Sequence, residues 1–485
     1  MEILNEDFKK LVYQATDMIT DWYDKKIRGS KIYNNKSPAE IRETFKIKSK
    51  NKGTSPSEVI KKLEKNLIEA SNFNPSPNYY GYITGGGNQI GIIAEYIKAA
   101  LNQNNLKWHS APANSEIEKI VIEWISEFIG YNKKCGGVLV SGGSVANLMN
   151  IAVMRKVKGG KKIKEKGIYN EEVMRVYVSE EGHSSIDKAM DILGLGSENL
   201  IKINKDKNFK IQVNELEKQI NLDIKSGFKP IGVIGIAGTT NTGSVDPMDK
   251  ILKICKKFDL WFMVDAAYGG PAAGLKEYKN LFKGMEKADS ILLNPHKWMF
   301  VPFEVACVLV KNQQQLKNTF SLIPEYLMGG ADIEEREDLM NYSIQLSKDF
   351  KALKVWMTIE VFGHSTISKA IKNDIEMALY AYEKIKNNKL FKPLHKPELS
   401  IFCFKYISKS DNISDDLLNK KIIEEIEKDG RIFLSGTKIN NENVLRINCI
   451  NHRRKREDID FLIKVLEELG SKAEKELPNL SLKNF

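Results

Sequence analysis

The sequence predicts an α/β fold, built on a mostly parallel β-sheet with helices on both of its faces. Between about residues 90 and 310, short runs rich in Val, Ile and Leu alternate with helical segments. The runs are apolar throughout, which is typical of strands that are buried on both faces. The 485 residues, 42% of them hydrophobic, are enough for a large core and for more than one domain.

The N-terminal segment, residues 1–75, is expected to form polar amphipathic helices. Phe8, Leu11 and Trp22 recur at helical spacing, and the loop at residues 53–56 interrupts the pattern. An apolar stripe of this kind cannot bury itself alone. We therefore expect the segment to pack against a second subunit and to act in dimerisation.

Residues 76–355 are expected to form the large domain, and residues 356–485 a small α+β domain. The strands expected in the large domain are continuous apolar runs: Gly137–Val140, Arg175–Val178, Ile231–Ile236, Leu260–Val264, Ser290–Leu293 and Ala306–Val310. In the small domain we expect strands at 401–406 and 444–449, closed by a helix at 456–469.

Composition favours an ordinary globular protein of the cytoplasm. No apolar run approaches the ~20 residues that cross a bilayer, and the first residues lack the features of a secretory signal. The five cysteines are odd in number and widely spread, so we expect buried thiols and neither a disulfide framework nor a metal site.

An anion-binding protein is the alternative from a different functional class. Its support is the net charge of +11 and the basic run at residues 452–456. However, lysine-rich stretches alternate with acidic ones, and the basic run precedes Glu457 and Asp458 at a helix start, with which it can pair. We therefore expect a solvated surface, with no nucleic-acid partner and no membrane partner.

Two strand ends carry the chemistry that a reactive site needs. Lys297 lies between His296 and Trp298, and a lysine that attacks an aldehyde as a Schiff-base nucleophile must be partly desolvated to lose its proton. Asp265 ends the run at 260–264, at the edge where ligands collect in α/β sheets. Its carboxylate is a candidate partner for a cationic ring nitrogen.

Three further polar motifs follow predicted strands. Ser141-Gly-Gly-Ser144 lies between a strand and a helix, where backbone N–H groups can cradle a phosphate. His183 follows the run at 175–178, and Thr240 lies in the loop after the run at 231–236. Each motif has an ordinary structural interpretation when taken alone.

Together these motifs resemble the group II pyridoxal-phosphate (PLP) decarboxylases, the family of the aromatic-amino-acid, histidine and glutamate decarboxylases. The resemblance is strongest from about Pro77 to Lys311. It implies a large domain of PLP fold type I (aspartate aminotransferase-like), with PLP as the cofactor. It also implies decarboxylation of an L-amino acid, with an aromatic one favoured, to the amine and CO2.

The resemblance assigns the site residue by residue. Lys297 is the cofactor lysine, Asp265 holds the pyridine nitrogen, and His183 stacks on the ring; these are the expected catalytic residues. The cofactor-binding residues that it implies are Gly143, Ser144, His183, Thr240, Asp265, Ala267, Asn294, His296 and Lys297.

Substrate residues are expected from two aromatic stretches. Tyr80 and Tyr82 fall in the family's substrate-channel motif, and Trp108 and His109 fall in a stretch that lines the neighbouring subunit's site. The resemblance therefore implies a homodimer with shared active sites. Lys107 and His109 could instead hold the second carboxylate of an acidic amino acid, so the substrate stays open.

The residue that protonates Cα after CO2 leaves is sought between Tyr326 and Phe350. Aromatic decarboxylases carry a tyrosine there, whereas related aldehyde synthases carry phenylalanine. Alignment back from Phe350 places Leu339 or a neighbour at that point, and Tyr342, the nearest tyrosine, falls a few residues late. Tyr342 is the candidate, and the choice between an amine and an aldehyde product stays open.

Overall fold

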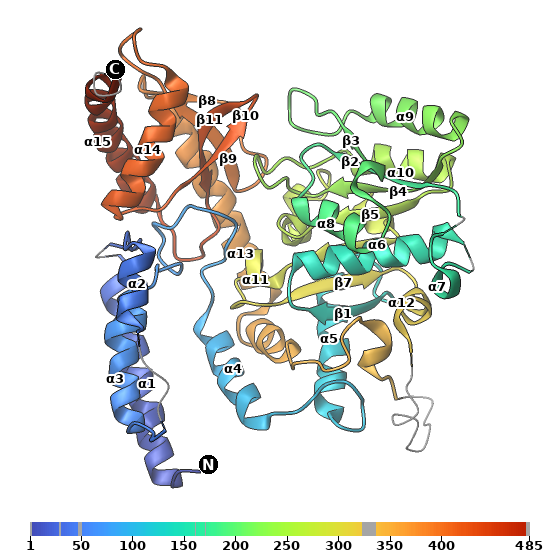
Figure 1. Cartoon of the computed structure of the whole chain (residues 1–485), viewed down its shortest axis with the longest axis horizontal. Helices are drawn as coiled ribbons and strands as arrows, with labels where there is room; N and C mark the ends of the chain where they lie inside the picture. Colours follow the sequence, from blue (N-terminus) through green and yellow to red (C-terminus); the bar gives the residue numbers. More distant parts are fainter. Residues whose placement is uncertain are drawn as a thin grey trace. The chain divides into compact units, whose positions relative to one another are not determined.

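The structure is a computed structural model that describes residues 2–28, 31–46, 51–160, 162–169, 171–322 and 336–481 (Figure 1). It contains two compact units. The first consists of Met1–Tyr82, Leu379–Leu394 and Cys403–Phe485, and the second of Ile83–Ala378 and His395–Phe402. The division into three domains that we expect from the sequence stays a prediction.

The second unit is built on a seven-stranded sheet in the order β1-β7-β6-β5-β4-β2-β3. The strands are β1 (Gly136–Val140), β2 (Met174–Ser179), β3 (Leu200–Ile203), β4 (Lys229–Ile236), β5 (Trp261–Asp265), β6 (Ser290–Leu293) and β7 (Ala306–Val310). Strands β6, β5, β4, β2 and β3 are parallel, and β7 runs antiparallel to β1 and β6. The predicted α/β class with a mostly parallel sheet is confirmed.

Helices precede, connect and follow these strands, in keeping with the alternating sequence pattern. They are α4 (Gln89–Leu101), α5 (Pro112–Phe128), α6 (Gly143–Gly159), α7 (Ile163–Lys166), α8 (Ser184–Ile192), α9 (Val213–Lys225), α10 (Met248–Lys257), α11 (Pro295–Trp298) and α12 (Gln313–Phe320). Helix α13 (Ala352–Lys386) starts in the second unit and ends in the first, and Gly363 interrupts it with a φ of 65°.

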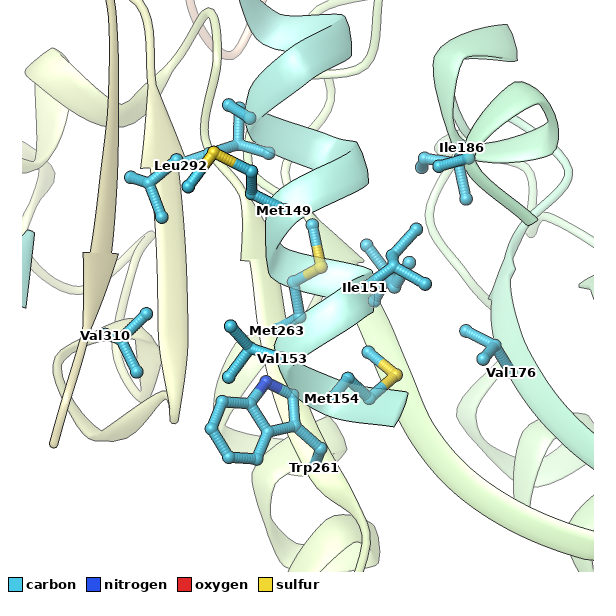
Figure 2. Close-up of a cluster of buried hydrophobic side chains, with 14 of the residues drawn as sticks. Met149, Ile151, Val153, Met154, Val176, Ile186, Trp261, Met263, Leu292 and Val310 are labelled. Atoms are coloured by element: carbon cyan, nitrogen blue, oxygen red, sulfur yellow. The ribbon is translucent and has the colours of Figure 1, made fainter. Parts of the chain in front are cut away.

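The main core lies between helix α6 and the sheet. Figure 2 shows buried side chains of α6, among them Met149 and Val153, in one cluster with Leu292 of β6 and Val310 of β7. A Cβ atom on Gly232 of β4 would lie 2.7 Å from the Met154 sulfur, so glycine permits this close approach of strand and helix. The helix is thereby held across the strands whose ends form the site.

Within its described residues, the first unit contains helices and a four-stranded sheet. Its strands, in the order β10-β11-β9-β8, are β8 (Phe391–Pro393), β9 (Ile401–Tyr406), β10 (Ser435–Ile439) and β11 (Glu442–Asn448). Helices α14 (Asp415–Asp429) and α15 (Arg456–Ser481) pack on each other. The expected strands at 401–406 and 444–449 correspond to β9 and β11, and the closing helix is longer than expected.

The predicted N-terminal helices are α1 (Asn5–Lys26), α2 (Pro38–Thr44) and α3 (Pro56–Leu63), which a π-helical turn (Glu64–Ile68) extends. Helix α1 has no buried residue, and Phe8 and Tyr13 are 47% and 58% exposed. Within the described part of the chain, no helix combines the length and the apolar character that a membrane crossing needs.

Candidate active site

A cavity of about 430 Å³ in the second unit opens at the carboxyl ends of the sheet strands. Its walls come from the segments that follow β1, β2, β4, β5 and β6. All nine residues expected to bind a cofactor line it: Gly143, Ser144, His183, Thr240, Asp265, Ala267, Asn294, His296 and Lys297. The tertiary structure therefore brings together residues that are up to 154 positions apart in the sequence.

Lys297 is held at the cavity by neighbours that are buried in the protein. Trp298 is fully buried, donates from Nε1 to Asp374 Oδ2 at 2.9 Å and stacks on Tyr268 with ring centroids 5.1 Å apart. The backbone N–H of Lys297 donates to the Asn294 carbonyl at 2.9 Å. This short helical turn, α11, therefore fixes the lysine backbone and leaves its half-buried side chain at the cavity wall.

His296 is a neutral neighbour of Lys297. Burial, followed by the charge of Lys297, lowers the pKa of His296 to about 3. Its Nδ1 accepts a hydrogen bond from the Val305 N–H at 3.0 Å. A Cβ atom on Gly85 would lie 2.3 Å from the Lys297 carbonyl oxygen, so a side chain at Gly85 would displace the lysine backbone.

The predicted phosphate cradle, Ser141 to Ser144, lies at the start of helix α6. Gly142 caps this 17-residue helix, and the residues from Gly142 to Val145 line the cavity with backbone N–H groups of the first turn. A Cβ atom on Gly142 would meet nothing within 4 Å, and one on Gly143 would lie 3.0 Å from Asn294 Nδ2. The buried Asn294 Oδ1 has no hydrogen-bond partner among the described residues. The backbone N–H groups of the helix start suit an anion, whereas the Asn294 oxygen, an acceptor, does not add to this preference.

Asp265, at the end of β5, forms the opposite wall with two residues that the sequence did not single out as site residues. Its Oδ1 accepts from the Ala267 N–H and its Oδ2 from Asn147 Nδ2, both at 3.1 Å. Ser185 binds Nδ1 of His183 through its hydroxyl at 2.8 Å. Asn147 lies four residues after Gly143 on α6, and residues four apart share one face of a helix. This spacing could have identified Asn147 as a site residue from the sequence.

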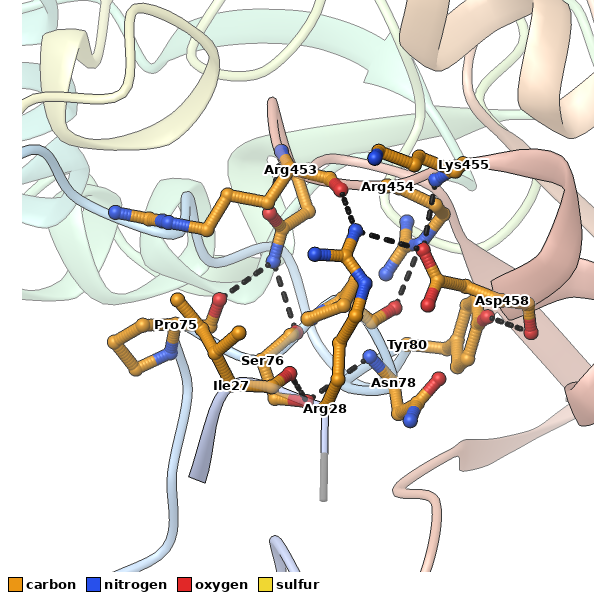
Figure 3. Close-up of polar contacts among 12 residues, drawn as sticks. Ile27, Arg28, Pro75, Ser76, Asn78, Tyr80, Arg453, Arg454, Lys455 and Asp458 are labelled. Carbon is orange, nitrogen blue, oxygen red and sulfur yellow. Dashed lines mark hydrogen bonds and ion pairs between the residues drawn. The ribbon is translucent and has the colours of Figure 1, made fainter. Parts of the chain in front are cut away.

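The expected substrate residues do not line this cavity. Tyr80 belongs to the first unit, is fully buried and donates from its hydroxyl to the Asp458 carbonyl at 2.9 Å (Figure 3). Tyr82, also in the first unit, is exposed. In the second unit, Trp108 is half-buried and His109 is exposed. Their assignment to the substrate stays a prediction.

The basic run at residues 452–456 includes a buried clamp. Arg454 is 2% exposed, lies over the Tyr80 ring and donates to the carbonyls of Pro77 and Tyr79, each at 2.8 Å. Figure 3 shows Arg454 among the polar contacts around Tyr80 and Asp458. This arginine therefore serves the packing of the first unit and is not part of an exposed basic surface.

Tyr342, the sequence candidate for the proton donor, is a core residue. It lies in a 3-10 turn (Leu339–Tyr342), is 6% exposed and does not line the cavity. Burial raises its pKa to about 12. Residues 326–335 of the segment in which we sought the proton donor lie outside the described residues.

The fold and the site together define a class of protein. A mostly parallel sheet whose strand ends hold a lysine, a carboxylate and a glycine-rich helix start is the arrangement of fold type I PLP enzymes. Residues 38–407 match the family model described as the pyridoxal-dependent decarboxylase conserved domain. The chain belongs to this family and is a PLP-dependent amino-acid decarboxylase, as the sequence motifs predicted.

Individual relatives agree with this membership. The chain is 32% identical over 96% of its length to an aromatic-L-amino-acid decarboxylase of Bacillus atrophaeus, covering 97% of that protein. It is 26% identical, over 91% of the chain and 89% of the relative, to a phenylacetaldehyde synthase of a Rosa hybrid cultivar. The Oryza sativa TDC structure with PLP and tryptamine superposes with a TM-score of 0.91 at 21% identity, over 97% of this chain and 99% of that one.

Proposed function

We propose that this enzyme decarboxylates an aromatic L-amino acid to the corresponding amine and CO2. The observation that carries the proposal is the single cavity in which all nine expected cofactor residues meet. The choice of an aromatic substrate is supported by the relative from Bacillus atrophaeus, which shares nearly the whole chain.

The residues present fit PLP, and their positions suggest how each would hold it. The first turn of α6, with the Ser144 hydroxyl and the Asn294 Nδ2 group as donors, would bind the phosphate, and the open space beside Gly142, where a Cβ atom would meet nothing within 4 Å, leaves room for it. Asp265 would keep the ring nitrogen protonated, and Lys297 would hold the cofactor covalently. When bound, PLP supplies an electron sink for the charge that remains at Cα as CO2 leaves.

The protein's own groups would favour decarboxylation in two ways. His183 lines the cavity where the cofactor ring would lie, and desolvation lowers its pKa, so the imidazole is neutral near pH 7. A neutral ring does not hold the substrate carboxylate as an ion pair. The neutral His296 likewise adds no second positive charge beside Lys297 that could hold the carboxylate as an ion pair.

Oxidative decarboxylation to an aldehyde is the second candidate. The observation that favours it is the position of Tyr342, which is buried away from the cavity. Tyr268 does line the cavity, but its hydroxyl is engaged with Ser400 Oγ at 2.6 Å. Decarboxylation of an acidic amino acid is a further alternative, with Lys107 and the exposed His109 as its possible carboxylate ligands.

We also propose that the enzyme is a homodimer with shared active sites and acts in the cytoplasm. Exposed apolar side chains on α1 and α3, including Phe8, Tyr13 and Val59, suggest a surface that a second subunit covers. The buried thiols Cys255 and Cys307, whose pKa values are raised by burial, fit a reducing compartment.

The function is tested by incubating the PLP-loaded protein with each common L-amino acid and quantifying CO2, amine, aldehyde and hydrogen peroxide. We expect CO2 and amine in equal amounts from an aromatic substrate, and neither product from Lys297→Ala. Aldehyde with peroxide would select the oxidative alternative. Turnover of glutamate or aspartate alone would overturn the aromatic assignment.

A further inference from the structure

We propose that Asn147 and Ser185 are positioning residues that fix the tautomer of His183, with the ring proton on Nε2. Neither residue belongs to the cofactor-binding set expected from the sequence. Both are buried, at 1% and 3% exposure, and both lie between Asp265 and the His183 ring.

The donors and acceptors along this chain of hydrogen bonds are assigned starting from Asp265. An ionised carboxylate can only accept hydrogen bonds, so the amide group of Asn147 that faces Oδ2 at 3.1 Å must be its NH2. The same Nδ2 lies 3.0 Å from the Ser185 hydroxyl oxygen. The two hydrogens of one amide nitrogen therefore bind Asp265 and Ser185, and the Ser185 oxygen acts as an acceptor.

The chain continues from Ser185 to the imidazole. Because the Ser185 oxygen accepts from Asn147, its own hydrogen is available for the ring nitrogen Nδ1 of His183, 2.8 Å away. The backbone N–H of Ser185 also donates to Nδ1, at 3.1 Å, where His183 caps helix α8. A nitrogen that accepts two donors cannot carry a hydrogen, so the proton of the neutral ring lies on Nε2.

This arrangement has a consequence for the reaction, which rests on the function proposed above. Nε2–H is the donor that His183 can offer into the cavity, and the side-chain route from Asp265 supports it together with the Ser185 backbone N–H. The charged and titratable groups that act on the ring are Asp265, Lys297, Lys188 and Asp187. Desolvation is the largest cause of the lowered His183 pKa, and protonation at Nδ1 would also break both hydrogen bonds from Ser185.

The test is ¹⁵N NMR of the full-length protein labelled at histidine, with and without PLP. The chain has only six histidines, and His183→Asn identifies the signals of interest. We expect a pyridine-type Nδ1 and a pyrrole-type Nε2 in both forms at neutral pH. A protonated Nδ1 in the neutral wild-type ring would overturn the proposal, whether or not any variant folds.

Variants separate positioning from general structure. Ser185→Ala should raise the His183 titration midpoint by about half to one pH unit, the effect of one lost hydrogen bond, and should move the acid limb of kcat/KM in the same direction. Asn147→Ala, which no longer orients the Ser185 hydroxyl, should raise the midpoint in the same direction by a smaller amount, while the Ser185 backbone N–H keeps Nδ1 an acceptor in both variants. Ser185→Thr, which keeps the hydroxyl, and Ser184→Ala, an exposed neighbour, should match the wild type.

An unchanged midpoint in both Ser185→Ala and Asn147→Ala would also overturn the proposal. The NMR result does not depend on turnover, so the two proposals fail separately. The expected tautomer in a protein that decarboxylates no amino acid would leave the positioning inference standing and remove the proposed function. The opposite tautomer in an active decarboxylase would do the reverse.

Discussion

At the residue scale, the proposed role of Asp265 needs a negative charge, and the fold holds that charge in a fixed position. Its two oxygens already accept hydrogen bonds from Ala267 and Asn147, so the side chain is held in place before any ligand arrives. Preorganised charge of this kind stabilises a transition state without reorganisation at the moment of reaction. A substitution at Asp265 should therefore distinguish an effect on catalysis from an effect on stability.

We predict that Asp265→Asn lowers kcat by about 10²- to 10³-fold, the usual effect of removing one preorganised electrostatic contact. The shape of the side chain is retained, so circular dichroism and the urea midpoint should change little. Steady-state kinetics with the PLP content measured in parallel is the check. A wild-type kcat in a variant that retains PLP would contradict the role of Asp265.

A second residue-scale prediction concerns pH and lies outside the cavity. Burial and the neighbouring Arg453 lower the pKa of His452 to about 3, so the folded protein keeps this ring neutral while the unfolded chain protonates it near pH 6.5. Its lowered pKa therefore destabilises the fold progressively as the pH falls from about 6.5 towards 3. Nothing is lost from this source above pH 7.

Between pH 7 and pH 5 the penalty from His452 should reach about 2 kcal/mol in the free energy of unfolding. Over this interval, the free energy of unfolding of His452→Asn should fall by about 2 kcal/mol less than that of the wild type. Urea unfolding at the two pH values measures the difference. Identical losses in the two proteins would show that the ring does not resist protonation in the folded state.

At the scale of elements, a buried ion pair ties helix α5 to the strand that leads into the predicted phosphate cradle. Lys348 Nζ lies 2.8 Å from Glu118 Oε1, and their side chains are 2% and 1% exposed. The same Glu118 oxygen accepts from the Leu139 N–H at 3.0 Å, and Lys348 donates to the Leu139 carbonyl at 3.3 Å. Both charges thus hold the backbone of β1 two residues before Ser141.

Lys348→Met should cost about 3–5 kcal/mol of stability, because it leaves the Glu118 carboxylate buried without its partner. The double variant Lys348→Met, Glu118→Leu should recover much of this loss. Lys257→Met is the matched control, since the pair of Lys257 and Glu217 is exposed and should contribute only about 0–1 kcal/mol. Equal urea midpoints for the Lys348 and Lys257 variants would show that the buried pair of Lys348 and Glu118 does not stabilise the fold.

At the scale of the whole molecule, the proposed dimer predicts that the two active sites share residues between chains. Trp108 does not line the cavity of its own chain, and its indole N–H donates to Glu116 at 2.6 Å. If Trp108 completes the partner's site, a mixed dimer of Lys297→Ala and Trp108→Ala contains one intact site. Random mixing should then restore roughly a quarter of wild-type activity.

The matched control mixes Lys297→Ala with Asp265→Asn. These two residues line the cavity of one chain, so no mixed dimer contains an intact site and activity should stay at the background level. Sedimentation at the assay concentration establishes the oligomeric state. Full activity in a monomer, or equal activity in the two mixtures, would rule out shared sites that involve Trp108.

The sequence alone was sufficient for the fold class, the family and the cofactor. Continuous apolar strands between helices predicted the mostly parallel sheet, and the string around Lys297 with Asp265 at a strand end predicted PLP; the architecture and the family model confirm them. The fold class follows from local patterns, because hydrophobic period is readable along the chain, whereas the family and the cofactor followed from the resemblance of the motifs to known decarboxylases. Short strands such as β3 and β10 gave no comparable signal.

The contacts between distant segments were decided only by the tertiary structure. In the sequence, Asn147 is an ordinary polar residue of an apolar helix, but folding places it between Asp265 and Ser185. Arg454 belongs to a basic run in the sequence, but packing buries it against the Tyr80 ring. Tyr342, a candidate by sequence position, is a core residue in space. Local sequence determines which groups are available, but burial and hydrogen-bond partners depend on residues far along the chain.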